Sequence, residues 1–183
     1  MARWIPPNNV GMNEQIGRRL FEEPMLRGAA GQPNFSGLRL NHFEETRGNE
    51  VSLDRLGATG IDRKVSTYLR HRADLAGQTF SKVKQFDGWA VVPAKELAEA
   101  RKDPKLPVTS SPISGVEPND NAYHAHVLRP NTLSPYLMAL HLKHIFTSYG
   151  KVHSVETAEA TRLDRLLNMP IVQGLLNVFR RYL

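Results

Sequence analysis

The chain has 183 residues, of which 40% are hydrophobic and 23% are charged. These proportions are ordinary for a soluble globular protein, and the length corresponds to one domain on a scale of roughly 100–200 residues per domain. The absence of cysteine excludes disulfides, thiolate metal sites, iron–sulfur clusters and a cysteine nucleophile. Lysine and arginine total 24 against 18 acidic residues, so the net charge is +6 and acidic partners are favoured.

Targeting and cofactor motifs are missing from the sequence. The first residues contain no apolar run of about 7–15 residues of the kind that a secretory signal requires. No stretch approaches about 18 consecutive apolar residues, the length of a membrane-spanning helix. The motifs G-x-x-x-x-G-K-[ST], G-x-G-x-x-G, G-x-S-x-G and H-E-x-x-H do not occur. We therefore expect a cytoplasmic protein that needs no cofactor and does not bind a membrane.

Residues 1–36 are rich in proline and glycine, which favour turns and extended chain. Within them, Asn13 is a suitable N-cap, apolar residues recur from Ile16 at helical spacing, and Pro24 would end a helix. We therefore expect an N-terminal arm that carries one short helix between residues 13 and 26.

Residues 37–130 combine strand-like and helical periodicities, as an α/β core does. Alternating or short apolar segments predict strands at 38–43, 51–56, 79–86, 89–92, 106–109 and 121–128. Apolar residues at helical spacing predict helices at 61–76 and 94–101. The predicted fold class is α+β, with a small mixed sheet and two helices in this core.

Residues 131–183 have the pattern of helices. Ser134 and Pro135 provide a cap and a first-turn proline, and Gly150 would end that helix. A second helical stretch follows and is interrupted at Pro170. We expect a helical C-terminal extension to the core.

The predicted strand at 121–128 places His124 and His126 on one face, because they are two residues apart. Two histidines on one face are suited to acid–base work on a single substrate, or to binding a metal ion together. The alternative is that they lie at the sheet surface and pair with a nearby carboxylate such as Asp120.

A metal site would need further ligands. His141 and His144 stand three apart on the following helix, and with the strand pair they would make a four-histidine cluster. Their neighbours Leu137, Leu140 and Ile145 are apolar, so we expect hydrogen-bonded histidines beside packed side chains instead. No metal site is predicted.

Ser52, Asp54 and Arg55 form a second polar group in the sequence. In a turn at the end of its strand, Arg55 would be able to hold a phosphate through two guanidinium nitrogens. It would then act together with His124 and His126. The alternative for Arg55 is an ion pair that serves only the structure.

A basic surface is predicted on the helix at 61–76 and the strand after it, comprising Arg63, Lys64, Arg70, Arg72, Lys82 and Lys84. Such a surface can follow a nucleic-acid backbone through its phosphates. No helix-turn-helix, zinc-finger or RNA-binding motif accompanies it, and a solvated helix opposite an apolar stripe has the same pattern. Nucleic acid is therefore retained as one candidate partner.

The order of segments in the core resembles that of small uncharacterised bacterial proteins. These share a strand beginning Ser-x-Asp/Asn, here Ser52-Leu53-Asp54, and a late strand containing His-Ala, here His124-Ala125. The likeness covers residues 43–130 and carries no assigned activity. It implies a bacterial origin and a special role for the segment around His124.

Two functions are consistent with these features. The first is a basic, non-catalytic subunit or adaptor of a bacterial assembly, which binds a protein partner or a second copy of itself through its C-terminal helices. The contact residues would be Leu163, Leu166, Ile171, Leu175 and Phe179. The second is a small enzyme acting on a phosphorylated or nucleotide substrate, with His124 and His126 as acid and base and Arg55 on the phosphate.

Overall fold

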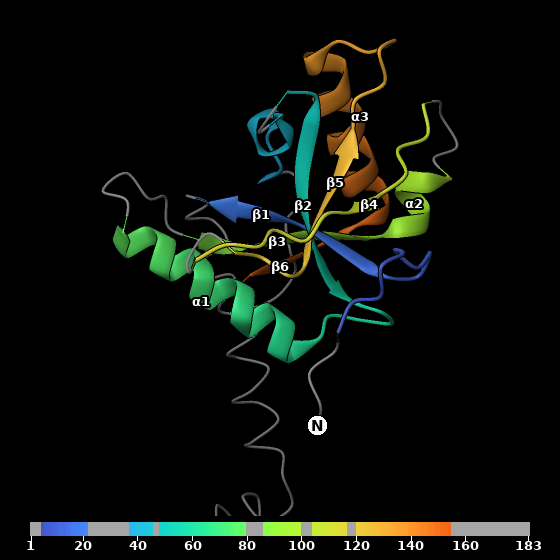
Figure 1. Ribbon diagram of the computed structural model, residues 1–183. Helices are drawn as coiled ribbons and strands as arrows, with labels where there is room; N and C mark the ends of the chain where they lie inside the picture. Colours follow the sequence, from blue (N-terminus) through green and yellow to red (C-terminus); the bar gives the residue numbers. More distant parts are fainter. Residues whose placement is uncertain are drawn as a thin grey trace, which may run out of the picture.

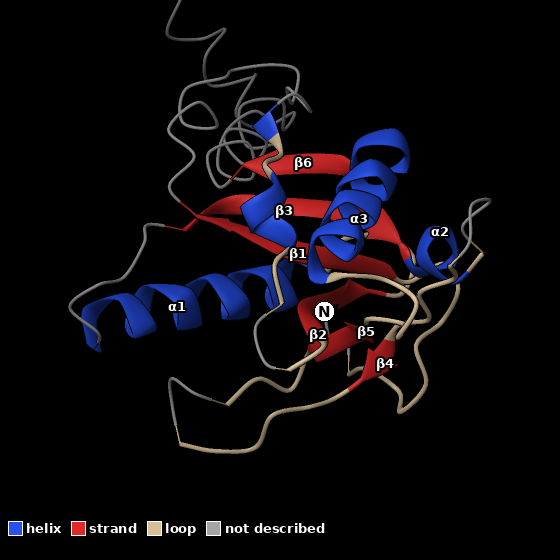
Figure 2. Ribbon diagram, turned by 90° about the horizontal axis from the view of Figure 1, so that it is seen from above, coloured by secondary structure: helices blue, strands red, loops and turns tan. Residues whose placement is uncertain are grey.

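Alternating apolar segments from distant parts of the chain pair into one antiparallel sheet with helices on both faces (Figures 1 and 2). The computed structural model describes residues 5–21, 37–45, 48–79, 86–99, 104–116 and 120–154. The strands are β1 (Gln15–Phe21), β2 (Glu50–Gly57), β3 (Phe86–Pro93), β4 (Thr109–Ser110), β5 (His124–Leu128) and β6 (Lys151–Ser154). They follow the order β4-β5-β2-β1-β3-β6, and each described pairing is antiparallel. The predicted α+β class is therefore confirmed, whereas the expectation of a mixed sheet is wrong for the described strands, which pair only in antiparallel fashion.

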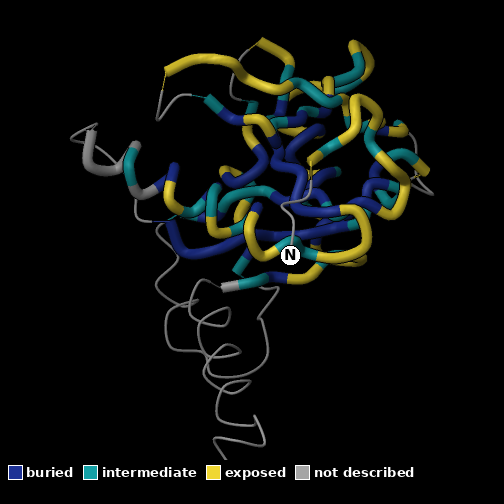
Figure 3. The backbone as a smooth tube through the Cα atoms, turned by 60° about the horizontal axis from the view of Figure 1, so that its bottom comes forward, coloured by how far each residue is buried: buried dark blue, intermediate teal, exposed yellow. Residues whose placement is uncertain are grey.

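The described helices divide between the two faces of the sheet. They are α1 (Arg63–Thr79), α2 (Ala94–Ala98), α3 (Pro135–Tyr149) and a short 3-10 helix, η3 (Leu40–Phe43). α1 packs on one face, whereas α2, α3 and η3 pack on the other. Figure 3 shows the buried residues concentrated at the centre of the described fold, with the exposed segments around them.

β1 occupies the centre of the sheet, between β2 and β3. The helix predicted between residues 13 and 26 is therefore wrong for its described part. Ile16 and Leu20 point to the same side in either structure, because four residues make about one helical turn and also an even number of strand positions. Pairing with two distant strands decides between helix and strand for this segment, and no local sequence pattern contains that information. β1 also joins the predicted arm, residues 1–36, to the core.

Residues 38–43 form a turn and η3 where the alternation predicts a strand. The backbone N–H of His42 donates to the Arg39 carbonyl, and the N–H of Arg39 donates to Nδ1 of His42. Leu38 and Phe43 are both buried against the core on the α3 side. The alternation of apolar and polar residues therefore reflects burial of the two ends of this segment, and the strand predicted at 38–43 is wrong.

The remaining predicted elements of the core agree with the structure to different extents. The strands predicted at 51–56, 89–92 and 121–128 coincide with or overlap β2, β3 and β5. The helices predicted at 61–76 and 94–101 overlap α1 and α2. The strand predicted at 106–109 overlaps the short edge strand β4, and most of the one predicted at 79–86 lies outside the described residues.

Each of the two long helices is capped at its N-terminus by the side chain of the residue that precedes it. The Asp62 carboxylate accepts a hydrogen bond from the Val65 N–H at 3.0 Å at the beginning of α1. The Ser134 hydroxyl accepts one from the Leu137 N–H at 3.3 Å, and Pro135 occupies the first turn of α3, as predicted. Both contacts satisfy a backbone donor that has no partner within the helix.

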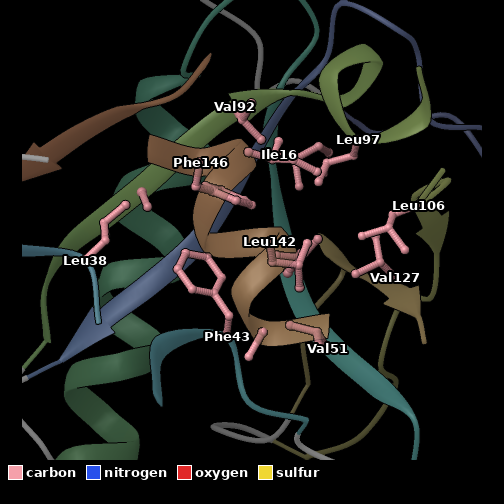
Figure 4. Packing of buried hydrophobic residues seen from close by; sticks show 14 of the residues in the cluster. Ile16, Leu38, Phe43, Val51, Val92, Leu97, Leu106, Val127, Leu142 and Phe146 are labelled. Atoms are coloured by element: carbon pink, nitrogen blue, oxygen red, sulfur yellow. The ribbon is translucent and has the colours of Figure 1, made fainter. Parts of the chain in front are cut away.

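The larger apolar core lies beneath α2 and α3 (Figure 4). Ile16, Val51 and Val92 come from three neighbouring strands, and Leu142 and Phe146 come from α3. Each is nearly inaccessible to solvent. Burial of a side chain of this size stabilises the fold by about 1.5–3 kcal/mol, so this face supplies most of the hydrophobic stabilisation.

A smaller cluster packs beneath α1. Val65 and Leu69 of α1 contact Leu56 of β2, Trp89 of β3 and Tyr123 before β5. This smaller cluster covers the α1 side of β1, β3 and the last part of β2. The polar part of β2 and β5 on the same side therefore remains at the margin of this cluster.

Gly17 permits the close contact between β1 and the cluster beneath α1. A Cβ at this position would lie 2.5 Å from Cδ1 of Leu56 and 3.0 Å from Cδ1 of Trp89. We expect Gly17→Ala to lower the free energy of unfolding by about 1–3 kcal/mol through overpacking, as measured by urea denaturation. Gly60→Ala is the matched control, because no atom would approach its Cβ within 4 Å. Equal stability of the two variants would contradict the expectation.

The predicted C-terminal extension, residues 131–183, is described as far as β6. α3 is the first of its predicted helices, and β6 then pairs with β3 at the edge of the sheet. The predicted partner-binding residues Leu163, Leu166, Ile171, Leu175 and Phe179 lie outside the described residues. Among the described residues, no helix is both long enough and apolar enough to cross a membrane.

Candidate functional site

Polar side chains gather on the α1 side of the sheet, where β2 and β5 pair. Asp54 lies opposite His124, and Ser52 lies opposite His126, so these four side chains share one face. The two imidazole rings have centroids 6.4 Å apart. We use the name polar cluster for Arg19, Ser52, Asp54, Asn121, His124 and His126.

Asp54 lies at the centre of the polar cluster. Arg19 binds it in a bidentate manner, with Nε 2.6 Å from one carboxylate oxygen and Nη2 2.8 Å from the other. The Asn121 amide donates to the same carboxylate at 2.8 Å. Burial by itself would raise the Asp54 pKa, but the charge of Arg19 and these hydrogen bonds outweigh it and hold the pKa below its ordinary value. Asp54 is therefore an anion that positions Arg19.

The turn before β5 links the polar cluster to α1. Asp120 accepts a hydrogen bond from the Tyr68 hydroxyl at 3.2 Å and forms an ion pair with Arg72. The Arg72 guanidinium also lies 5.5 Å from the centroid of the Tyr68 ring. Because Asn121 contacts Asp54, two successive residues attach this turn to α1 and to β2. The strand with the histidines is thus held in a fixed position.

The orientation of His124 is fixed by the carbonyl oxygen of Ser111, which lies 2.8 Å from Nδ1. A carbonyl can only accept a hydrogen bond, so Nδ1 carries the proton and, in the neutral ring, Nε2 carries the lone pair. Burial lowers the His124 pKa and outweighs the raising effects of the Ser111 hydrogen bond and the Asp54 charge, and the charges of His126 and Arg19 lower it slightly further. His124 is therefore a neutral imidazole at pH 7, with a basic nitrogen at Nε2.

His126 has a different environment on the same face. It lies between Ser52 of β2 and Thr109 of β4, its partners in the two strand pairings. Its Nδ1 is buried and has no hydrogen-bond partner among the described residues. A buried polar atom without a partner is costly, and such atoms in native structures call for an explanation. The His126 ring is therefore positioned by strand pairing and packing and not by a hydrogen bond at Nδ1.

Arg19 brings a partly accessible positive charge to the polar cluster. Its side chain is 29% exposed, in contrast with 4% for Asp54. The carboxylate engages Nε and Nη2, and Nη1 forms no hydrogen bond with a described residue. The guanidinium is therefore held in place by Asp54 while one donor nitrogen is available to an anion.

Arg55 lies on the opposite face from the histidines, because it follows Asp54 directly in β2. It is fully buried and forms a bidentate ion pair with Glu14, with nitrogen–oxygen distances of 2.5 and 2.9 Å. The guanidinium also donates to the carbonyls of Pro7 and Asn9 and to the Ser110 hydroxyl. The structure thus places Arg55 away from His124 and His126, in the ion pair considered as its alternative role.

The predicted basic surface on α1 is divided by the structure. Arg63 and Lys64 are exposed, and Arg70 is half-buried. Arg72 is 4% exposed and turned toward Asp120, so it is not presented to solvent. The other two predicted members, Lys82 and Lys84, lie outside the described residues.

His141 and His144 are on α3, across the sheet from the polar cluster. Nε2 of His141 lies 3.0 Å from the Pro104 carbonyl, and His144 is exposed. The structure therefore does not bring the four histidines together. In the described part of the chain, no group of three or more His, Asp or Glu residues is arranged to hold a metal ion.

Arg19 and Asn121 are the members of the polar cluster that the sequence interpretation missed. Arg19 lies in the segment interpreted as a helical arm, and its place beside Asp54 depends on long-range pairing of β1 and β2. Asn121 precedes a strand that contains two candidate histidines. This position was the one sequence feature that indicated a place for Asn121 in the polar cluster.

Comparisons with protein families, with curated proteins and with solved structures give no match for this chain. Any function must therefore be inferred from the chemistry of the polar cluster.

Proposed function

We propose that this protein is a small enzyme that acts on a phosphorylated or nucleotide substrate at the polar cluster. In this proposal His124 is the general base and His126 is the general acid. Arg19 contacts the phosphate, in the role that the sequence suggested for Arg55. The observation that carries the proposal is the pair of imidazoles on one face, which also presents an arginine that Asp54 holds and that has an available donor nitrogen.

The state of His124 supports its role as a base. An effective base must be largely unprotonated at the working pH and must present its lone pair to the substrate. The Ser111 carbonyl directs the lone pair to Nε2, and burial lowers the pKa. The three-part arrangement of base, orienting group and available nitrogen is typical of catalytic histidines.

The separation of the rings supports action on a single group. Proton transfer requires heavy-atom distances of about 2.6–3.2 Å between the catalytic nitrogen and the reacting oxygen. With centroids 6.4 Å apart, the two imidazoles can approach two oxygens of one phosphoryl group. Arg19 lies on the same face one strand further away, held by Asp54 of the strand between them, and would contact a third oxygen. Positive charge beside developing negative charge is the main means by which enzymes stabilise phosphoryl transfer.

The adaptor hypothesis depends on side chains beyond Ser154, which lie outside the described residues. No described contact favours it over the enzyme, so it is not developed further.

Inorganic phosphate is the probe that tests the proposal. NMR titration of the imidazole nitrogens in the full chain is expected to show that saturating phosphate raises the His124 pKa by about 1, because a bound anion favours the imidazolium form. We expect Arg19→Gln to weaken phosphate binding about tenfold, the loss of one charge-assisted hydrogen bond.

Two further variants make this result specific. Lys64→Gln removes an exposed charge from α1 and should leave phosphate affinity unchanged within about twofold, whereas Arg19→Lys keeps a charge beside Asp54 and should retain part of the affinity. Circular dichroism checks that each variant is folded. Imidazole titrations that do not respond to phosphate, or that respond equally in Arg19→Gln, would show the proposal to be wrong.

A further inference from the structure

We infer that the substrate of the polar cluster is RNA and that the reaction is cleavage of a phosphodiester by the neighbouring 2′-hydroxyl. This inference rests on the proposed function and names its substrate class. It draws on three features of the described residues: the pair of histidines, the arginine that Asp54 holds on the same face, and exposed basic residues on the helix that borders the site.

The two histidines supply both proton transfers that this reaction needs. His124 Nε2 takes the proton of the 2′-hydroxyl, and the 2′-oxygen forms a bond to phosphorus. The bond between phosphorus and the 5′-oxygen breaks, and protonated His126 donates a proton to that oxygen. The products are a 2′,3′-cyclic phosphate and a 5′-hydroxyl, and exchange of protons with water restores both imidazoles.

The substrate supplies its own nucleophile in this reaction. An attacking group held on the same molecule reaches effective concentrations of about 10⁵–10⁸ M, so the protein need not bind and orient a water molecule. The protein then has two tasks, to transfer protons and to stabilise the negative charge that develops on phosphorus. His124 and His126 suit the first task, and the Arg19 guanidinium suits the second.

The position of the site suits a chain of phosphates. His124 and His126 are half-buried side chains on a sheet face, and α1 borders that face through the contact of Tyr68 with Asp120. Arg63 and Lys64 are exposed on the first turn of α1. With a net charge of +6, the protein attracts a polyanion over a distance of about 8–10 Å at ordinary salt. A polymer can contact the cluster and α1 at the same time.

Cleavage of a fluorescent oligoribonucleotide by the full chain tests this inference. The matched control substrate has the same sequence with 2′-O-methyl groups, which removes the nucleophile and leaves the phosphates unchanged. We expect cleavage of the first and none of the second, and a product with a 2′,3′-cyclic phosphate in mass spectrometry. A bell-shaped dependence of rate on pH is expected, because one imidazole must be neutral and the other protonated.

Variants of single histidines locate the activity. His124→Gln and His126→Gln are each expected to reduce the rate by about 10²–10⁴-fold. His71→Gln, at an exposed position on α1, should leave it unchanged. Because all variants are purified identically, equal cleavage by the wild type and both cluster variants would assign the activity to a contaminating nuclease and overturn the inference.

The remaining outcomes separate this inference from the proposed function. Cleavage of the 2′-O-methyl substrate would overturn the 2′-hydroxyl mechanism. If RNA remains intact while phosphate still raises the His124 pKa in an Arg19-dependent manner, RNA is not the substrate and the proposed function stands. If phosphate has no effect either, both are wrong.

Discussion

Replacing Arg55 with Ala is expected to lower the free energy of unfolding by about 3–5 kcal/mol, the cost of removing one partner of a buried ion pair. Arg55 and Glu14 are both nearly inaccessible to solvent, so neither charge can be satisfied by water once the other is removed. The guanidinium also holds the carbonyls of Pro7 and Asn9, which attaches the segment before β1 to the sheet. The substitution therefore removes an ion pair and several hydrogen bonds together.

Urea denaturation of Arg55→Ala measures the effect, with Arg63→Ala as the control. Arg63 is exposed on α1, and its removal should change the stability by no more than about 0.5 kcal/mol. A double-mutant cycle with Glu14→Met and Arg55→Met separates the ion pair from the other contacts. We expect the double variant to be less destabilised than the sum of the single ones. Additive losses would show that the two charges do not interact.

Replacing Asp54 with Asn is expected to lower the free energy of unfolding by about 3 kcal/mol at pH 7, at the lower end of the range for a buried pair. The loss is smaller than for Arg55 because the Arg19 side chain is 29% exposed and can turn toward water. The Asn121 amide, which donates to the Asp54 carboxylate, would then face an amide that is a weaker acceptor.

The effect of Asp54→Asn should depend on pH in a defined direction. The pKa of Asp54 is lowered in the folded protein from its ordinary value of 3.8, so the ionised carboxylate stabilises the fold above about pH 4. As the pH falls from 3.8 through the folded pKa, the wild type loses this contribution, whereas the variant has none to lose. The difference in stability between them should therefore be largest near neutral pH and shrink below pH 4.

Urea unfolding of the wild type and Asp54→Asn at several pH values between 3 and 7 measures this difference. Asp62→Asn is a suitable control, because Asp62 is a partly accessible helix cap rather than a member of the polar cluster. If the difference in free energy of unfolding between the wild type and Asp54→Asn stays constant down to pH 3, the role assigned to the ionised carboxylate is wrong.

The sequence by itself determined the elements whose periodicity is local and unambiguous. β2, the main part of α1 and α3 each combine a clear apolar pattern with a cap or a terminating glycine, and β5 alternates strictly. Alternation in β5 was also sufficient to predict that His124 and His126 share a face, because side chains two residues apart on a strand point the same way. The histidine pair of the polar cluster could therefore be found from the sequence.

Only the tertiary structure decided the remainder. Ile16 and Leu20 are compatible with a helix and with a strand, and pairing with β2 and β3 made the segment a central strand. The same pairing brought Arg19 to Asp54 across a separation of 35 residues, and it left Arg55 buried with Glu14 on the other face. An arginine lies on the histidine face of the sheet only if its strand joins that part of the sheet and its side chain points to that side. The second condition depends on whether the residue occupies an odd or an even position in the strand. Strand order is set by burial of the whole sheet between two helical layers, and no local segment of the sequence contains it.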